Sequence, residues 1–331
     1  MCDEEDDECK DCPCCITCAN WTFICIVMII KTFALASWWV GIAIPWAFHT
    51  TVAGWINIIC LHFFFGMMEL SYWKTVFAKP GFTDISWKPS GYTQEEMDKA
   101  RNNKSNPRDR RHKLEFDRCR YCNYCQAWKP PRSHHCKELK RCVLRMDHYC
   151  PWVFNVVGLR NHKTFLLFLF YSTTCLTYFL VLLLWRLIDT IMHLDIHEMM
   201  SPFDLVIFIM NFVLVLPVTI AIASLFIYQV STCLRNLTSI ETYLSKRHKR
   251  AAKRKGEANY RWPYDLGWKR NLRQMMGKTW LEVFTPGFSY DSDGYQYKMR
   301  PGHGKKSVPV VVDKGAPQKV SKRSNAGGHN D

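Results

Sequence analysis

The chain has 331 residues, 16 of them cysteines, and a formal net charge of +15. Its apolar residues are concentrated in blocks instead of being spread along the chain, which excludes an ordinary soluble globular protein. We therefore predict an α-helical polytopic membrane protein.

Residues 1–19, which begin MCDEEDDECKDC, are acidic and rich in cysteine. A signal peptide begins with a basic segment, so we expect this segment and the helix after it to be retained. The cysteines have no histidine among them, and metal binding and acylation remain open for them. Acylation beside the membrane is the favoured reading. The positions concerned are Cys2, Cys9, Cys12, Cys14, Cys15 and Cys18.

Four apolar blocks approach or exceed the ~20 residues that a helix needs to cross the ~30 Å core of a bilayer. Two lie within residues 20–73, at 20–44 and 52–73, and two within 164–230, at 164–188 and 205–230. Lys31 and Glu69 lie inside the first pair, where snorkelling and a position near the boundary compete with a functional role. We predict four transmembrane helices.

The basic residues predict the orientation. Residues 74–163 contain 20 Lys and Arg and residues 231–331 contain 21, whereas the links 45–51 and 189–204 contain none. By the positive-inside rule, both termini and the central loop face the cytosol. Cytosolic thiols stay reduced, so cysteines in that loop are expected to bind metal or act in catalysis.

Residues 119–163 form the cysteine-rich core of the central loop and contain too little apolar sequence to fold alone. Three thiolates and one imidazole at zinc-ligand spacing predict a closed structural zinc site. Its ligands are Cys122, Cys125, His135 and Cys142, and Cys119 is ambiguous.

The run from Cys122 through KPPRSHHC and Cys142 to DHYCPW and Asn155 closely resembles the cysteine-rich domain of the DHHC protein S-acyltransferases. That family also places this domain between its second and third spans. NLTSIE at 236–241 resembles its TTxE element, YDLGWKRN at 264–271 its YDxGxxxN element, and KPGF at 79–82 its DPG element.

Two departures from the family pattern matter. The DHHC motif reads Asp147-His148-Tyr149-Cys150, and the positions of a second zinc site are Cys136, Leu139, Tyr149 and Val156. Three of those four cannot bind zinc. We expect one structural zinc per chain, with the second site replaced by side-chain packing.

The resemblance implies that Cys150 is a nucleophile and acyl carrier, His148 its general base and Asp147 the residue that orients the histidine. A free cysteine is only partly thiolate at neutral pH and needs such a base. The implied reaction is protein S-palmitoylation. Cys150 takes a long-chain acyl group from acyl-coenzyme A and passes it to a cysteine of a membrane-associated protein, with ping-pong kinetics.

Other roles are carried over in the same way. Lys129, Arg132 and His134 match coenzyme-phosphate positions and Trp152 the position beside the thioester, although basic residues can equally contact anionic lipid. Ser239 is expected to support Asp147, and Asn271 to brace the C-terminal segment 231–300. Phe165, Phe168 and Tyr171 are weaker candidates for lining an acyl cavity.

The remaining expectations concern location and partners. The basic run 246–255 fits an anionic-lipid contact better than nucleic acid, and residues 301–331 are expected to be disordered. The endoplasmic reticulum or Golgi membrane is the expected location, with an accessory subunit left open. The competing hypothesis is a catalytically silent membrane scaffold, against which the retention of Asp147, His148 and Cys150 argues. A transporter lacks support, because paired broken helices are missing from the sequence pattern.

Overall fold

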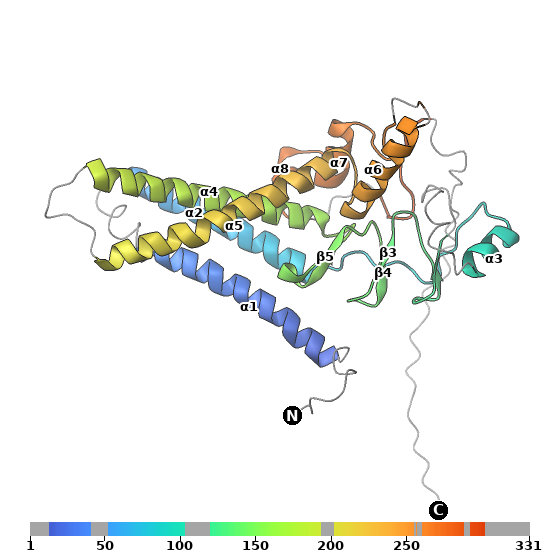
Figure 1. Ribbon diagram of the computed structural model, residues 1–331, viewed down its shortest axis with the longest axis horizontal. Coiled ribbons are helices and arrows are strands. Elements are labelled where there is room, and N and C mark those ends of the chain that lie inside the picture. Colours follow the sequence, from blue (N-terminus) through green and yellow to red (C-terminus); the bar gives the residue numbers. More distant parts are fainter. Residues whose placement is uncertain are drawn as a thin grey trace, which may run out of the picture.

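The structure is a computed structural model that describes residues 13–40, 52–102, 120–192, 202–254, 256, 260–287 and 292–301. Long helices lie side by side, and a small β-rich module with several short helices lies at one end of them (Figure 1). Three parts of the sequence analysis lie outside the described residues: residues 1–12, for whose cysteines acylation was favoured over metal binding; Cys119, whose role was left open; and residues 302–331 of the tail that was expected to be disordered.

Four helices are long and apolar enough to cross a membrane: α1 (Pro13–Trp38), α2 (Val52–Phe77), α4 (His162–Met192) and α5 (Pro202–Leu234). This confirms the four predicted spans. α2 packs against α4, and α4 packs against α5. α2, α4 and α5 extend past the apolar blocks that predicted them, because backbone hydrogen bonding continues into flanking residues such as His162 and Lys74. α1 begins before its predicted block, at Pro13, and ends at Trp38.

The two charged residues within the first pair of spans contact each other. Lys31 Nζ lies 2.7 Å from Glu69 Oε1 and 3.9 Å above the centre of the Tyr72 ring. The second Glu69 oxygen accepts a hydrogen bond from Trp73 Nε1 at 3.1 Å. A charge in a membrane is costly unless it is paired, so this ion pair fastens α1 to α2, in place of the snorkelling considered for Lys31.

The module consists of three two-stranded antiparallel sheets. The first pairs β1 (Tyr121–Cys122) with β2 (Ala127–Trp128), and the second pairs β3 (His134–Cys136) with β4 (Arg141–Val143). The third pairs β5 (His148–Cys150) with β6 (Asn155–Val157) around the short 3-10 helix η5 (Pro151–Val153). Strands this short bury little apolar surface, so other interactions must hold the module together.

Backbone contacts fix the module to the end of α2. The Gly81 carbonyl accepts from Leu144 N at 2.8 Å, and the Pro80 carbonyl accepts from Arg160 N at 3.1 Å. Gly158 has no room for a side chain, since a Cβ there would lie 2.7 Å from the Pro80 oxygen. The Asn155 amide donates to three carbonyls at the end of α2, those of Thr75, Val76 and Ala78, and so caps this helix.

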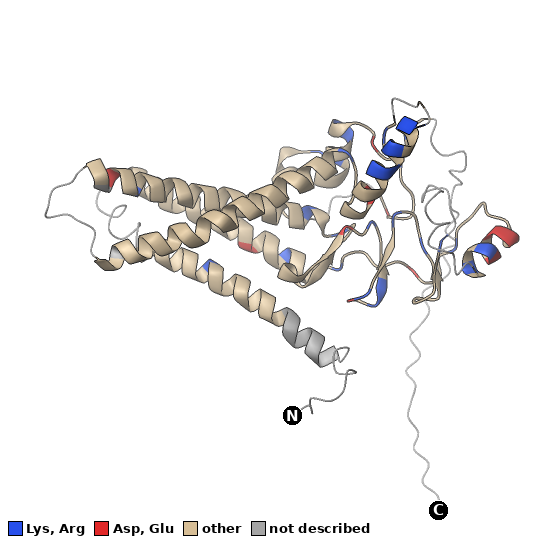
Figure 2. Cartoon of the chain, viewed as in Figure 1, with Lys and Arg blue, Asp and Glu red and all other residues tan. Residues whose placement is uncertain are grey.

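Four short helices complete the described part of the chain: α3 (Gln94–Asn102), α6 (Ser239–Arg254), α7 (Trp268–Met276) and α8 (Trp280–Phe284). Asn271 connects α7 to the end of α5, because its amide donates to the Leu234 carbonyl at 2.8 Å and to Asp265 Oδ1 at 2.7 Å. Basic residues gather along α6, whereas the middles of the long helices carry few charges (Figure 2).

Candidate active site and metal cluster

Strand β5 places His148 and Cys150 on one face and Tyr149 on the other, since side chains alternate along a strand. Cys150 is 6% exposed and lies in an apolar cluster with Tyr72 and Phe165. The Tyr149 ring packs against a different cluster on the opposite face. The Tyr149 side chain therefore lies outside the apolar cluster that surrounds Cys150.

The Asp147 carboxylate lies at the centre of a dense set of hydrogen bonds. It has no exposed side-chain surface, and its Oδ2 accepts from His148 Nδ1 at 2.7 Å. Ser239 donates its backbone N–H to Oδ1 at 2.7 Å and its hydroxyl to Oδ2 at 2.8 Å. The sequence placed Ser239 beside Asp147 by resemblance alone, and the structure brings the two together.

These Ser239 contacts exist because Asp147 lies against the first turn of α6. Thr238 and Glu241 form a reciprocal cap there. Thr238 N donates to Glu241 Oε2 at 3.0 Å and Glu241 N donates to the Thr238 hydroxyl at 3.2 Å. The positive end of a helix stabilises an anion. Burial opposes ionisation, but the hydrogen bond from His148, the charge of that imidazolium and the Ser239 N–H together hold the pKa of Asp147 well below its usual range.

The pKa of His148 responds in the opposite direction. Burial alone lowers this pKa, but the hydrogen bonds with Asp147 and Cys150 outweigh burial and raise it to about 9. The ring also lies edge-on to Phe165, with 5.4 Å between the ring centres. At neutral pH His148 is therefore an imidazolium that lies between the Asp147 carboxylate and the Cys150 sulfur.

The four predicted metal ligands meet in the module. The ligand atoms of Cys122, Cys125, His135 and Cys142 all lie within 4.8 Å of one another, and His135 Nδ1 lies 3.2 Å from Cys125 Sγ and 3.6 Å from Cys122 Sγ. Tyr124 stacks on the His135 ring with 4.8 Å between ring centres. Three sulfurs and one nitrogen at this spacing fit a tetrahedral zinc ion with ligand bonds of ~2.0–2.3 Å.

The four positions that correspond to the family's second zinc site form an apolar cluster. Cys136 and Val156 are fully buried and pack with Val143, and Leu139 and Tyr149 pack against them. Cys136 Sγ donates to Glu138 Oε2 at 3.0 Å instead of joining a metal-ligand set. The packing predicted to replace the second zinc site is what the structure shows, because three of the four positions carry apolar or aromatic side chains.

The four predicted acyl-coenzyme A contacts differ in their surroundings. Lys129 and His134 are half-buried, and Trp152 is 49% exposed, with its ring edge-on to Phe23 of α1. Burial, together with the nearby Arg120 and Lys129 charges, lowers the pKa of His134 to about 3. His134 is therefore neutral at physiological pH and can offer a phosphate only an uncharged hydrogen bond.

Arg132 is engaged inside the protein. Its guanidinium forms a two-point ion pair with Glu241, at 2.7 and 2.6 Å, and donates to the side chain and carbonyl of Asn236. It also lies over the Tyr264 ring, and its side chain is 1% exposed. Arg132 joins the module to α6, so this buried position does not support the phosphate contact expected from the sequence.

Sequence reasoning missed the residues behind Asp147. Gln229 of α5 donates to Asp147 Oδ2 at 3.1 Å and contacts His162 Nε2 at 3.0 Å, and His162 Nδ1 contacts the buried Arg145 at 2.9 Å. An amide inside the most apolar span was the available signal, because polar groups in a membrane usually have a function or a partner.

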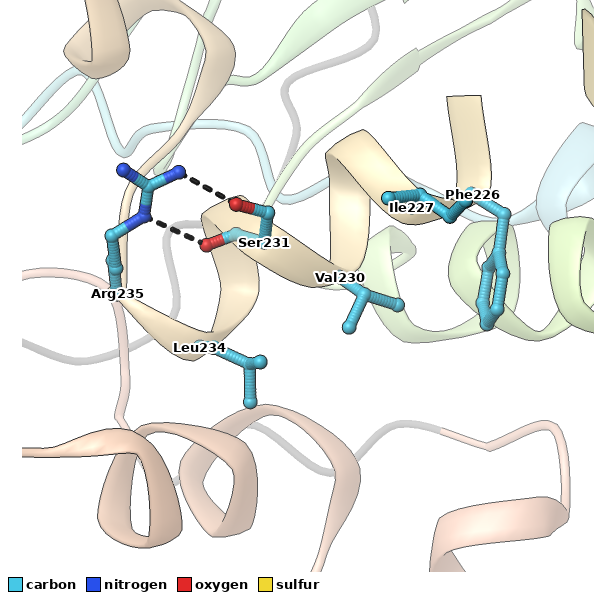
Figure 3. A pocket seen from close by; sticks show the side chains of 6 residues that line it. All are labelled: Phe226, Ile227, Val230, Ser231, Leu234 and Arg235. Carbon is cyan, nitrogen blue, oxygen red and sulfur yellow. Dashed lines mark hydrogen bonds between the residues drawn. The ribbon is translucent and has the colours of Figure 1, made fainter. Parts of the chain in front are cut away.

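Two grooves follow the outer surfaces of α4 and α5. One of about 430 Å³ extends along α5 from Phe226 to Arg235, whose guanidinium donates to the Ser231 carbonyl and hydroxyl (Figure 3). The other, of about 480 Å³, reaches from Phe226 along α4 to Val181. Neither groove is lined by Cys150, so the acyl cavity remains a prediction. Of its candidate lining residues, Phe165 and Phe168 pack in the Cys150 cluster, while the Tyr171 hydroxyl bonds the Phe284 carbonyl.

The fold and site define an integral membrane protein whose β-rich module contains a cysteine with an Asp-His pair and a separate metal-ligand cluster. Residues 115–246 match the family model for DHHC palmitoyltransferases. The chain is 32% identical over 262 residues to probable protein S-acyltransferase 14 of Arabidopsis thaliana, covering 74% of this chain and 78% of that protein. It is 30% identical over 270 residues to palmitoyltransferase ZDHHC2 of Mus musculus, covering 73% and 66%. The chain belongs to the DHHC palmitoyltransferase family, as its sequence motifs predicted.

Proposed function

We propose that this protein S-acyltransferase moves a long-chain acyl group from acyl-coenzyme A, through Cys150, to cysteines of protein substrates. Membership of the palmitoyltransferase family carries the activity. The observation that carries the route is that His148 and Cys150 share one face of β5 and that the buried Asp147 carboxylate pairs with His148. Nucleophile, base and orienting carboxylate are thereby in the order that activated nucleophiles require.

In the first step the Cys150 thiolate attacks the thioester carbonyl, and a new carbon–sulfur bond forms. The bond to coenzyme A breaks, and the coenzyme thiolate leaves with the proton held by His148. In the second step His148, now neutral, takes the proton of the substrate thiol, whose sulfur displaces Cys150 from the acyl group. Asp147 stays ionised throughout and stabilises the imidazolium each time it forms.

The two ends of the substrate need different surroundings. A palmitoyl chain has about 14 methylenes, and at ~0.8 kcal/mol each its exposure to water would cost about 11 kcal/mol. Support for a chain held among the spans comes from the apolar cluster around Cys150. The coenzyme phosphates then face the module, where Lys129 supplies a charge, His134 an uncharged donor and Trp152 an exposed ring.

The metal cluster fits a structural role. We propose that Cys122, Cys125, His135 and Cys142 hold one zinc ion, which cross-links a module whose own strands bury little surface. A closed set of four protein ligands leaves no open position for substrate. The ion therefore supplies folding energy and does not take part in the chemistry.

The orientation and location are part of the same proposal. The basic module and the end of α5 face the cytosol, both termini lie on that side, and the membrane is that of the endoplasmic reticulum or Golgi. Substrates are cysteine-containing proteins at the cytosolic membrane surface, with an accessory subunit compatible with this arrangement. The scaffold hypothesis is not favoured, because a scaffold does not require the Asp147-His148 pair.

The test is incorporation of labelled palmitoyl from its coenzyme A ester into the purified protein, as a bond that hydroxylamine cleaves. Cys150→Ser should abolish the label. Cys175→Ser, which changes a buried thiol of α4 outside the site, is the matched control and should retain it. Absence of label on folded wild-type protein, or equal labelling of the Cys150→Ser protein, would reject the proposed route.

A further inference from the structure

A continuous line of buried polar groups extends from the catalytic carboxylate into the membrane helices. Arg145, His162, Gln229 and Asp147 are each at most 1% exposed. Arg145 and Asp147 lie in the turn before β5, His162 begins α4, and Gln229 lies near the end of α5. Three separate parts of the chain therefore meet here. Burying polar groups is favourable only when each finds a partner.

The hydrogen-bonding chemistry fixes the direction of every contact. A guanidinium only donates, so His162 Nδ1, 2.9 Å from Arg145 Nη1, must be an acceptor. The imidazole is then neutral and carries its proton on Nε2, which donates to Gln229 Oε1 at 3.0 Å. The Gln229 amide nitrogen in turn donates to Asp147 Oδ2 at 3.1 Å. Reversing the amide would place an oxygen against a carboxylate.

The buried charges in this region come in pairs of opposite sign. Arg132 and Glu241 neutralise each other directly. Arg145 and Asp147 are the buried cation and anion at the two ends of the polar line. Aligned hydrogen bonds polarise one another in a low-dielectric interior, so a fixed cation at one end strengthens donation to the anion at the other.

We propose that Gln229 is a positioning residue for acyl transfer, and that the line Arg145–His162–Gln229 keeps Asp147 ionised and oriented toward His148. This role is additional to the contacts from Ser239. It rests on the proposed function, because it acts through the Asp147-His148 pair. Gln229 touches neither Cys150 nor, in this account, the acyl group.

Several groups around the pair enter any pH-dependent test. The charged or titratable residues packed around Asp147 and His148 are Cys150 of β5, Arg145, His162 of α4, Tyr72 of α2, Cys233 of α5, and Arg132 with Glu241 at α6. The substitution proposed below leaves all of them in place. It removes only the amide that connects His162, and through it Arg145, to Asp147.

The experiment replaces Gln229 by Met, which has similar length and suits a membrane helix. Loss of one hydrogen bond to a charged group should slow formation of the acyl-enzyme by about tenfold at neutral pH. Without this amide, Asp147 is held less firmly toward His148, so the imidazolium form of His148 is less stable. The alkaline limb of the rate profile, where His148 loses its proton, should therefore move to lower pH.

Asn211→Leu is the matched control. Asn211 is also a buried polar residue of α5, bonded to Ser37 at 2.7 Å, but it lies 18 residues from Gln229, about 27 Å along the helix. Its replacement tests the effect of removing a polar contact from this helix without touching Asp147. It should leave both the rate and the alkaline limb where the wild type has them.

The outcomes separate the two proposals. If the wild type forms no acyl-enzyme, the proposed function fails. If the wild type is active but Gln229→Met is no slower than Asn211→Leu, or is slower with an unmoved alkaline limb, the positioning role is overturned. Should Gln229→Met not fold, Gln229→Asn keeps the amide one methylene short, and an intermediate rate with a smaller shift of the limb supports the role, while a wild-type profile overturns it.

Discussion

At the scale of single residues, the pair Asp147-His148 decides the chemistry. Its 2.7 Å contact is fully buried on the aspartate side, and the pKa of His148 is about 9 because Asp147 and Cys150 outweigh the effect of burial. The histidine therefore begins the reaction protonated, as one half of an ion pair with Asp147, and not as a neutral base.

Asp147→Asn should lower the pKa of His148 toward its ordinary value of ~6.5, because the largest force that raises it is gone. The alkaline limb of acyl-enzyme formation should then fall from near pH 9 toward neutrality, measured as labelling rate against pH. A wild-type profile in the variant would show that another group controls this limb.

The same shift has a consequence for folding. Since the folded pKa of His148 is raised, its contribution to stability is fully present below the unfolded pKa of ~6.5 and disappears as the pH rises through about 9. The thermal midpoint of the wild type should decline across that window more steeply than that of His148→Gln. Parallel midpoints across the window would contradict the assigned direction.

Tyr149 lies on the face of β5 opposite His148 and Cys150, because side chains alternate along the strand. Its ring packs with Val156 and Cys136 on the face of β5 opposite Cys150. Tyr149→Phe should keep both activity and stability. Tyr149→Ala should lower the free energy of unfolding by about 2 kcal/mol, because it removes an aromatic ring that is about half buried. Chemical denaturation would measure this loss. Equal stability of the two variants would remove the packing role.

At the scale of elements, α6 is the support on which the site is assembled. Its first turn binds Asp147 through Ser239, and its Glu241 binds Arg132 of the module at 2.6 Å. The TTxE-like segment therefore combines a helix cap, an anion site and a buried ion pair in six residues. This explains why its Thr238 and Glu241 are fully engaged with neighbours.

Arg132→Met should destabilise the protein by about 3 kcal/mol, because Glu241 would be left as an unpaired buried charge. The double variant Arg132→Met with Glu241→Leu should recover much of that loss. Lys129→Ala should instead raise the KM for palmitoyl-coenzyme A without changing stability. A raised KM with unchanged stability in Arg132→Met would restore the phosphate-binding role that the sequence suggested.

At the scale of the whole molecule, sequence patterns predicted the features that depend on residues close together in the chain. Apolar blocks gave the four spans, and ligand spacing gave the cluster of Cys122, Cys125, His135 and Cys142. The position of Gln229 behind Asp147 could not be predicted, because that contact joins residues 82 apart in sequence. The burial of Arg132 could not be predicted for the same reason, since a basic residue looks solvent-facing until its partner 109 residues away is known.

The metal content also belongs to this scale. Purified protein should contain about one zinc ion per chain by elemental analysis, and its removal by chelation should unfold the module, detected as faster proteolysis between β1 and β6. Two ions per chain would contradict the apolar second cluster. An unchanged protease pattern after chelation would contradict the structural role of the first.

The most direct measurement follows one acyl group through both steps. Wild-type protein is loaded with labelled palmitoyl, freed of coenzyme A ester, and mixed with a membrane-anchored peptide that carries one cysteine. We expect the label to leave Cys150 and appear on the peptide at the same rate. Label that stays on Cys150, or transfer from the coenzyme ester to peptide by the Cys150→Ser protein, would contradict a two-step reaction through this cysteine.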